Sequence, residues 1–194
     1  PTDINLIKKL SKEKINFNFF NGKSKKIISV GKLSKQKNFD SLIETANYLI
    51  NVLKKDLKFL IIGEGECLKN IKIKIERYNL KNKIKIINFV KNPYKYISKS
   101  DLVVQTSLWE GSSNILIEAL ACKKKIVCYD IQGGTKEILD NGKNGLLAKY
   151  NDYKDLSKKI LLSLNQRRNI DQRKLSLFSV ENNLKKYKKL FDSK

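Results

Sequence analysis

Two glutamates, Glu110 and Glu118, stand with seven residues between them where a hydrophobic strand turns into a helix. The strand is predicted over Asp101 to Thr106, so Glu110 falls in the turn at its carboxyl end. Glu118 falls about five residues into the helix, which is roughly 7 Å along the axis at ~1.5 Å per residue. Carboxylates accept hydrogen bonds from hydroxyl groups, so the pair suits a ligand with hydroxyls at both ends.

The turn between the two glutamates suits an anion. The turn and the first helical residues are Gly111, Ser112, Ser113, Asn114, Ile115 and Leu116. We predict Ser113 as the N-cap, with the next three backbone N–H groups facing a phosphate at the positive end of the helix dipole. Ligands of open parallel sheets bind at the carboxyl ends of the strands. An anion between two hydroxyl-bearing groups describes a nucleotide sugar.

Two lysines follow another predicted strand, which runs from Lys26 and is ended by Gly31. Gly31 allows the backbone to bend sharply at that point. Lys32 and Lys37 lie in the following loop, from which both can reach one cleft. Two cations there would stabilise a diphosphate leaving group. The alternative is two solvated lysines in a chain that is rich in lysine.

The spacing of Glu110 and Glu118, with the Glu-Ala-Leu-Ala run over 118–121, resembles the Glu-x7-Glu motif of the retaining glycosyltransferases of family 4. The resemblance implies one half of a GT-B fold, with Glu110 on the donor sugar and Glu118 on the ribose. It covers about residues 25–190 and corresponds to the donor-binding C-terminal half. We therefore expect the acceptor-binding N-terminal domain to be a partner that is absent from this sequence.

The loop after the first strand resembles the family segment in which an Arg and a Lys hold the diphosphate. Lys32 replaces the Arg and loses its bidentate geometry, whereas Lys37 matches the family lysine. The segment from Asn88 resembles the loop that reads the base and implies base contacts for Phe89, Val90 and Lys91. Asn88 replaces a family glycine, and Asn tolerates left-handed backbone.

Glycine pairs and one departure complete the resemblance. We interpret Gly63-Glu64-Gly65 as a tight strand-to-helix turn rather than as a ligand contact. Gly133-Gly134 is interpreted as a close backbone approach to the ligand, and Glu137 as a residue that holds a loop. Lys123 stands where the family has Gly after the motif helix, so we expect that helix end to be built differently. Trp109 is assigned equally to the cleft and to the underside of the helix.

Composition bounds the chemistry. The chain has 194 residues and 41% hydrophobic residues, enough for one core. It has no His, and Cys67, Cys122 and Cys128 have no metal-ligand spacing. No Asp-x-Asp motif ends a predicted strand, so we expect no metal and no cofactor beyond the nucleotide sugar as substrate. No apolar run approaches the ~20 residues that span a bilayer.

The net charge is +22, from 41 basic and 19 acidic residues. A compositional bias toward Lys, Asn and Ile explains it, and attraction to an anionic membrane is the alternative. A nucleic-acid partner is disfavoured, because only four basic residues are Arg, which base-reading proteins prefer. The expected location is the cytoplasm, with peripheral docking on the cytoplasmic face of the inner membrane as the alternative.

Short apolar strands alternate with amphipathic helices. The strands are predicted over 26–31, 57–62, 84–87, 101–106, 125–130 and 145–148. This pattern predicts an α/β fold: a single Rossmann-like domain with a parallel sheet of about six strands and helices on both faces. We divide the chain into a connector with a short helix (1–25), a nucleotide-sugar-binding domain (26–165) and a C-terminal helical tail (166–194).

These expectations define a function. We predict the donor-binding domain of a retaining enzyme that moves a hexose or N-acetylhexosamine from a nucleotide diphosphate sugar, such as a UDP-sugar. Lys32, Lys37 and Glu110 would carry the catalysis. The acceptor would be a saccharide or a lipid-linked saccharide in surface polysaccharide or lipopolysaccharide synthesis. The alternatives are a starch- or sucrose-synthase-like transferase, a sugar-nucleotide epimerase, and a non-catalytic basic module that binds nucleic acid.

Overall fold

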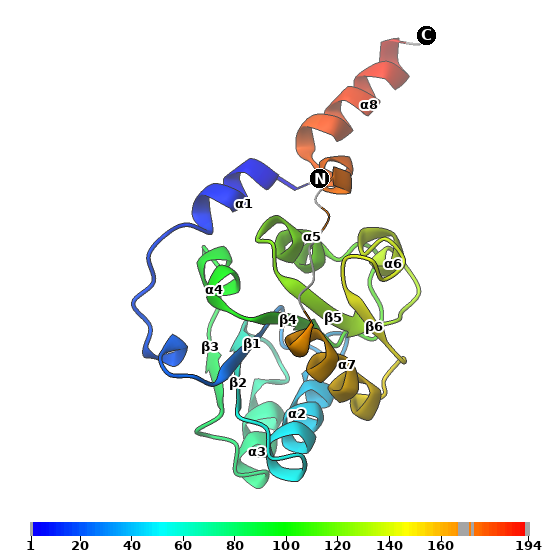
Figure 1. The fold of residues 1–194 in the computed structure, drawn as a ribbon. Coiled ribbons are helices and arrows are strands. Elements are labelled where there is room, and N and C mark those ends of the chain that lie inside the picture. Colours follow the sequence, from blue (N-terminus) through cyan, green and yellow to red (C-terminus); the bar gives the residue numbers. More distant parts are fainter. Residues whose placement is uncertain (1, 167–170, 172, 193–194) are drawn as a thin grey trace.

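The strands form one parallel sheet in the order β3-β2-β1-β4-β5-β6 (Figure 1). The computed structural model describes residues 2–166, 171 and 173–192. In these residues the strands are β1 Lys25–Val30, β2 Leu57–Ile62, β3 Ile84–Ile87, β4 Leu102–Gln105, β5 Lys125–Tyr129 and β6 Leu146–Ala148. The predicted fold is therefore confirmed, and each strand lies within one or two residues of its expected position.

Helices cover both faces of the sheet. They are α1 Ile4–Leu10, α2 Phe39–Asn47, α3 Leu68–Arg77, α4 Tyr94–Lys99, α5 Asn114–Ala121, α6 Thr135–Ile138, α7 Tyr153–Asn165 and α8 Val180–Asp192. One apolar core lies between the sheet and α2, α3 and α7, and the other lies between the sheet and α1, α4, α5 and α6. Successive side chains of a strand pack into opposite cores, as Ile27 and Ile28 do.

The strand order reverses between β1 and β4. β1 pairs with β2 at six positions, but it pairs with β4 at only two, Ile27 with Leu102 and Ile28 with Val103. The chain leaves β1 toward α2 on one face and leaves β4 toward α5 on the other. Such a switch point leaves a crevice at the carboxyl ends of the two strands.

The end of α5 differs from our expectation. Lys123, which replaces a family glycine, adopts left-handed backbone with φ 56°. The Lys123 N–H donates to Leu120 O at 2.9 Å, and the Lys124 N–H donates to Ala119 O at 2.9 Å. These two bonds form a Schellman motif. The prediction that this helix end is built differently is therefore wrong, because a lysine holds the conformation that glycine would adopt.

The start of α2 has no side-chain cap. Asn38 occupies the N-cap position, but its φ is 49° and its side chain makes no capping bond. Its Nδ2 instead donates to Asn151 Oδ1 at 3.0 Å. Beyond Asn47 the chain continues as a π-helical turn over Tyr48–Val52.

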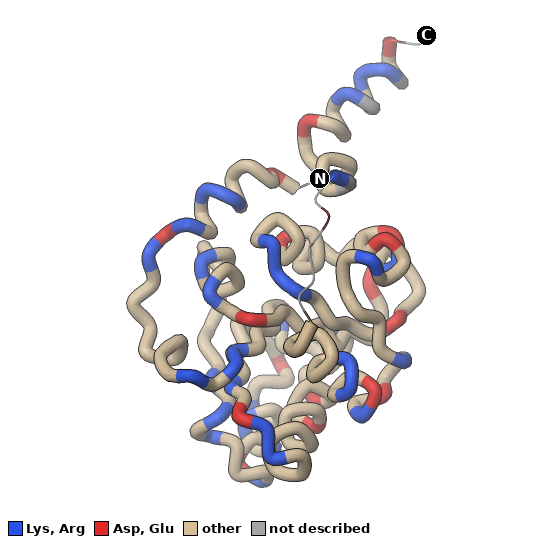
Figure 2. The backbone as a smooth tube through the Cα atoms, in the orientation of Figure 1, with Lys and Arg blue, Asp and Glu red and all other residues tan. Residues whose placement is uncertain are grey.

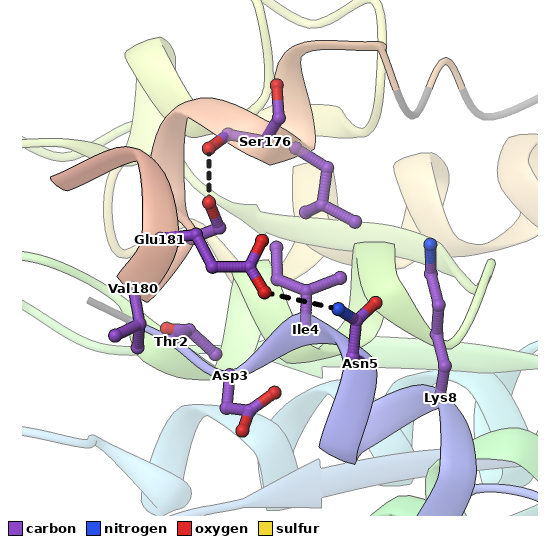
Figure 3. A pocket seen from close by; sticks show the side chains of 10 residues that line it. Thr2, Asp3, Ile4, Asn5, Lys8, Ser176, Val180 and Glu181 are labelled. Carbon is purple, nitrogen blue, oxygen red and sulfur yellow. Dashed lines mark hydrogen bonds between the residues drawn. The ribbon is translucent and has the colours of Figure 1, made fainter. Parts of the chain in front are cut away.

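The start of the described chain lies beside the segment that leads into α8. The Thr2 N–H donates to Phe178 O at 2.9 Å, and the Val180 N–H donates to Thr2 O at 3.3 Å. A pocket of about 300 Å³ opens between α1 and residues 175–181, where Asn5 donates to Glu181 Oε1 at 3.4 Å (Figure 3). From there α8 extends away from the sheet (Figure 1).

The division into connector, domain and tail stays a prediction. Ile4 and Ile7 of the predicted connector are buried in the core beneath α5. In the predicted tail, residues 167–170, 172, 193 and 194 lie outside the described residues. The predicted terminal helix corresponds to α8.

Candidate functional site

The loops that follow β1 and β4 are joined to each other. The Leu108 N–H donates to Gln36 O at 2.8 Å, and the Gln36 side chain donates to Trp109 O at 2.9 Å. The Thr106 hydroxyl donates to Lys37 O at 2.9 Å. The two loops therefore form one rim at the switch point of the sheet.

Lys37 and Glu110 form an ion pair across this rim, between Nζ and Oε1. The Lys37 side chain is 24% exposed and that of Glu110 only 7%. Ser107 Oγ and Gln105 Nε2 donate to the same oxygen at 2.7 and 2.9 Å. A carboxylate this buried needs a cation and further donors, and the fold supplies both.

Glu118 lies within α5 and contacts an aromatic residue of α4. The Tyr94 hydroxyl, at the start of α4, donates to Glu118 Oε1 at 3.4 Å. Burial raises the pKa of Glu118, an effect that the Tyr94 hydrogen bond opposes. Burial, with the charge of Glu118, raises the pKa of Tyr94 to about 12, so the phenol stays a donor. Sequence analysis missed Tyr94, although an aromatic residue directly after Pro93 was a visible signal.

The first turn of α5 differs from two expectations, the capping bond of Ser113 and the free N–H group of Leu116. Ser113 occupies the N-cap position, but its hydroxyl makes no capping bond and donates to Gln105 Oε1 at 3.1 Å. The Leu116 N–H donates to Ser113 O at 3.1 Å and is not available to a ligand. The N–H groups of Asn114 and Ile115 remain in the first turn, where a helix offers no internal acceptor.

An apolar cleft of about 430 Å³ lies beside the rim. Its walls come from the ends of β1, β2 and β3 and include Val30, Gly31, Lys32, Ile62, Phe89, Val90 and Pro93. Four predicted site residues, Gly31, Lys32, Phe89 and Val90, are thus brought together. Lys91 is exposed and lies outside this lining. An apolar wall with a cation at its edge suits a flat base attached to an anion.

The Gly63-Glu64-Gly65 turn presses against the loop after β1. A Cβ on Gly63 would stand 1.9 Å from Gly31 O, and one on Gly65 would stand 2.5 Å from Leu33 O. This close approach agrees with our interpretation of a tight turn. The same turn also lines the cleft, so its shape sets one wall.

Gly133 makes a similar approach to the motif itself. Its φ is +116°, and a Cβ there would stand 2.2 Å from Glu110 O. The Gly134 N–H lies 3.4 Å from Gly111 O, to which it donates. The loop after β5 therefore packs directly against the backbone of Glu110.

Several predicted site residues face solvent. Lys32 is exposed, and its ammonium group has no partner within the described residues. Trp109 is 56% exposed and Phe89 69%, so Trp109 is not packed beneath the helix. Gly111, Ser112 and Asn114 are also exposed, which leaves the surface between Glu110 and α5 open to a ligand.

Three further observations concern charge, metal ligands and membrane-spanning helices. Lys and Arg are spread along helices, loops and α8 (Figure 2). Within the described part of the chain, no three His, Cys, Asp or Glu residues are grouped so that they could hold a metal ion. Metal independence stays a prediction. None of the helices in the described ranges has the length and apolarity to cross a membrane.

Comparisons with known proteins identify the family of this chain. The family described as "Glycosyl transferases group 1" matches residues 11–178. A Campylobacter jejuni protein named N-acetylgalactosamine-N,N'-diacetylbacillosaminyl-diphospho-undecaprenol 4-alpha-N-acetylgalactosaminyltransferase is 40% identical over 126 residues, 65% of this chain and 33% of its own length. A Staphylococcus aureus poly(ribitol-phosphate) alpha-N-acetylglucosaminyltransferase is 33% identical over 180 residues, 84% of this chain and 35% of its own.

Solved structures show the same fold. A mutant of S. aureus TarM, crystallised with Fondaparinux, alpha-GlcNAc-glycerol and UDP, superposes with a TM-score of 0.69 and 31% identity, over 74% of this chain and 29% of TarM. Anabaena HepE with UDP superposes over 100% of this chain and 56% of its own, with a TM-score of 0.79 and 20% identity. The chain spans about a third of the length of the C. jejuni and S. aureus transferases named above.

Proposed function

The chain belongs to the glycosyl transferases group 1 family, and we propose that it is the donor-binding half of a retaining GT-B glycosyltransferase of family 4. The observation that carries the proposal is the buried Lys37–Glu110 pair at the switch point, beside the open first turn of α5. A buried carboxylate with a fixed orientation next to an anion site suits a sugar attached to a phosphate.

The donor would lie across the rim from the cleft to Glu110. Its base would fill the apolar cleft against Phe89 and Val90, and its ribose hydroxyls would donate to Glu118. The diphosphate would lie between Lys32 and the first N–H groups of α5. Its sugar would then reach Glu110, whose Oε2 has no partner within the described residues.

The chemistry would consist of charge stabilisation and positioning. As the bond between the anomeric carbon and the phosphate oxygen breaks, negative charge develops on the diphosphate. Lys32, Lys37 and the α5 N–H groups would stabilise that charge, while Glu110 holds a sugar hydroxyl. An acceptor hydroxyl attacking from the face that the diphosphate leaves, with its proton passing to the departing phosphate oxygen, would retain the anomeric configuration. No metal is invoked, because the lysines supply the positive charge.

The two named relatives support an N-acetylhexosamine donor. Both names specify alpha transfer of an N-acetylhexosamine, and the TarM structure contains UDP. A UDP-N-acetylhexosamine is therefore the proposed donor. One relative's name includes a diphospho-undecaprenol and the other a poly(ribitol-phosphate). We propose a lipid-linked or polymeric acceptor for this chain, in the synthesis of a surface polysaccharide.

Calorimetric titration of the chain with UDP, GDP, ADP and CDP tests the donor site. We expect UDP to bind selectively, and Glu118→Ala to weaken that binding about tenfold, the equivalent of ~1.4 kcal/mol. Glu76→Ala, at the exposed C-terminal end of α3 and away from the cleft, is the control and should leave UDP affinity unchanged. Equal binding of all four nucleotides, or a Glu118→Ala variant with unchanged affinity, would refute this placement. Steeply salt-dependent binding to RNA instead would favour the nucleic-acid alternative.

A further inference from the structure

Gln105 ends β4 with a buried polar side chain. Its exposure is 6%, between apolar strands on either side. Burying an amide costs free energy unless its polar atoms find hydrogen-bond partners. A strand that otherwise reads Leu-Val-Val would be served better by another apolar residue, so the amide requires a local reason.

The partners of Gln105 are the two parts of the proposed donor site. Its Nε2 donates to Glu110 Oε1 at 2.9 Å and to Ser107 Oγ at 3.1 Å. Its Oε1 accepts from Ser113 Oγ at 3.1 Å. Both polar atoms of the amide are therefore used, one toward the sugar-binding carboxylate and the other toward the first turn of α5.

The donors around Glu110 all converge on one oxygen. Lys37 Nζ, Gln105 Nε2 and Ser107 Oγ each donate to Oε1. Three donors fix the plane of the carboxylate, whereas Oε2 has no partner within the described residues. Of these three donors, Gln105 is the one whose side chain also bonds Ser113, in the first turn of α5.

We propose that Gln105 is a positioning residue that orients Glu110 toward the donor sugar and fixes it relative to the first turn of α5. The inference rests on the proposed donor site. The Ser113 hydroxyl, which would otherwise cap α5, is held by this amide instead. Gln105 thus couples the geometry of sugar recognition to that of phosphate recognition without touching the donor itself.

Gln105→Met tests the inference, because methionine has a similar length and no hydrogen-bonding amide. The control is Val104→Ala, the preceding buried residue of β4, which makes no side-chain bond to the site. We would titrate each variant with UDP and with UDP-GlcNAc. Gln105→Met should weaken UDP-GlcNAc about tenfold, or ~1.4 kcal/mol, and UDP by less than about threefold. Val104→Ala should lower stability and leave the ratio of the two affinities unchanged.

A ligand-free measurement separates failure of this inference from failure of the proposed function. The ¹³C resonance of the Glu110 side-chain carboxyl should shift and broaden in Gln105→Met but not in Val104→Ala. If wild type binds neither nucleotide, the donor proposal fails, and the carboxyl resonance alone decides the role of Gln105. An unchanged resonance overturns the inference. Equal weakening of UDP and UDP-GlcNAc by Gln105→Met also overturns it, because that is the result of a purely structural role.

Discussion

Lys37 and Glu110 are 73 residues apart in the sequence and meet as an ion pair where the strand order reverses. Lys37 belongs to the loop after β1, and Glu110 belongs to the loop after β4. The pair therefore joins the two halves of the sheet at the point where a donor would bind. The two loop lysines therefore differ, because the ammonium group of Lys32 is exposed and without a partner within the described residues.

Lys37→Met should destabilise the fold. The substitution leaves the buried Glu110 carboxylate with only the neutral donors Gln105 and Ser107. We expect a loss of about 2–3 kcal/mol in the free energy of unfolding, since an unpaired buried charge is costly. Urea unfolding measures it. Adding Glu110→Gln should restore part of the loss, and a fully additive double variant would contradict the pairing.

Lys32→Met is the matched comparison and should separate binding from folding. Because Lys32 has an exposed side chain, its removal should change stability by less than about 0.5 kcal/mol. It removes a cation from the edge of the cleft, so UDP should bind more weakly while uridine binds as before. A variant in which uridine and UDP weaken together would contradict a diphosphate role.

Gly133→Ala should be severely destabilising. A Cβ at this position would meet Glu110 O at 2.2 Å, and the φ of +116° is strained for any other residue. We expect a loss of more than about 2 kcal/mol, measured by thermal or urea unfolding. Gly111→Ala is the control, because a Cβ there meets nothing within 4 Å. Equal stabilities of the two variants would show that the loop after β5 does not press on Glu110.

Glu118→Gln should be more stable than wild type at neutral pH and should bind UDP less tightly. Burial raises the folded-state pKa of Glu118 above its ordinary value of 4.5. The folded state therefore holds its proton longer than the unfolded state, and this group lowers stability as pH rises from 4.5 through the folded pKa. Glutamine does not ionise, so the variant does not lose stability in this way. The difference in unfolding free energy should vanish below about pH 4 and grow with pH, and a constant difference would refute the burial effect.

Lys123→Gly should stabilise the protein. Lys123 holds left-handed backbone at the end of α5, a conformation that costs a non-glycine residue roughly 1 kcal/mol. We expect a gain of about 0.5–1 kcal/mol. Lys124→Gly, at a neighbour that does not have positive φ, should instead lower the unfolding free energy. Urea unfolding of both variants gives the comparison, and a destabilised Lys123→Gly would contradict the Schellman geometry.

Sequence patterns predicted the elements well because the information is local. Apolar runs ended by glycine located β1 and β2, and apolar residues three and four apart located α2. The expected proximity of Lys37 to the motif followed from the rule that ligand sites lie at the carboxyl ends of parallel strands. The family resemblance also named the glutamates and the lysines.

The contacts within the site could not be predicted, because they join distant segments or use residues that look ordinary. Nothing local indicates that Gln105 turns inward to Glu110 and Ser113, since a Gln at the end of a strand is usually solvated. Tyr94 reaches Glu118 from another helix. The prediction for Lys123 was wrong because we expected a different helix-end motif in the absence of glycine. Lys123 instead adopts the left-handed backbone itself.

The short ladder between β1 and β4 has a consequence for how the domain opens. Two paired positions join these strands, against six between β1 and β2 and four between β4 and β5. Amide hydrogen exchange should therefore divide the domain into two cooperative units that separate along this seam before either one unfolds. A donor held by both loops would bridge the seam. Its binding would then slow amide exchange in β1 and β4 together, because the bound substrate would stabilise the contact between the two parts of the sheet.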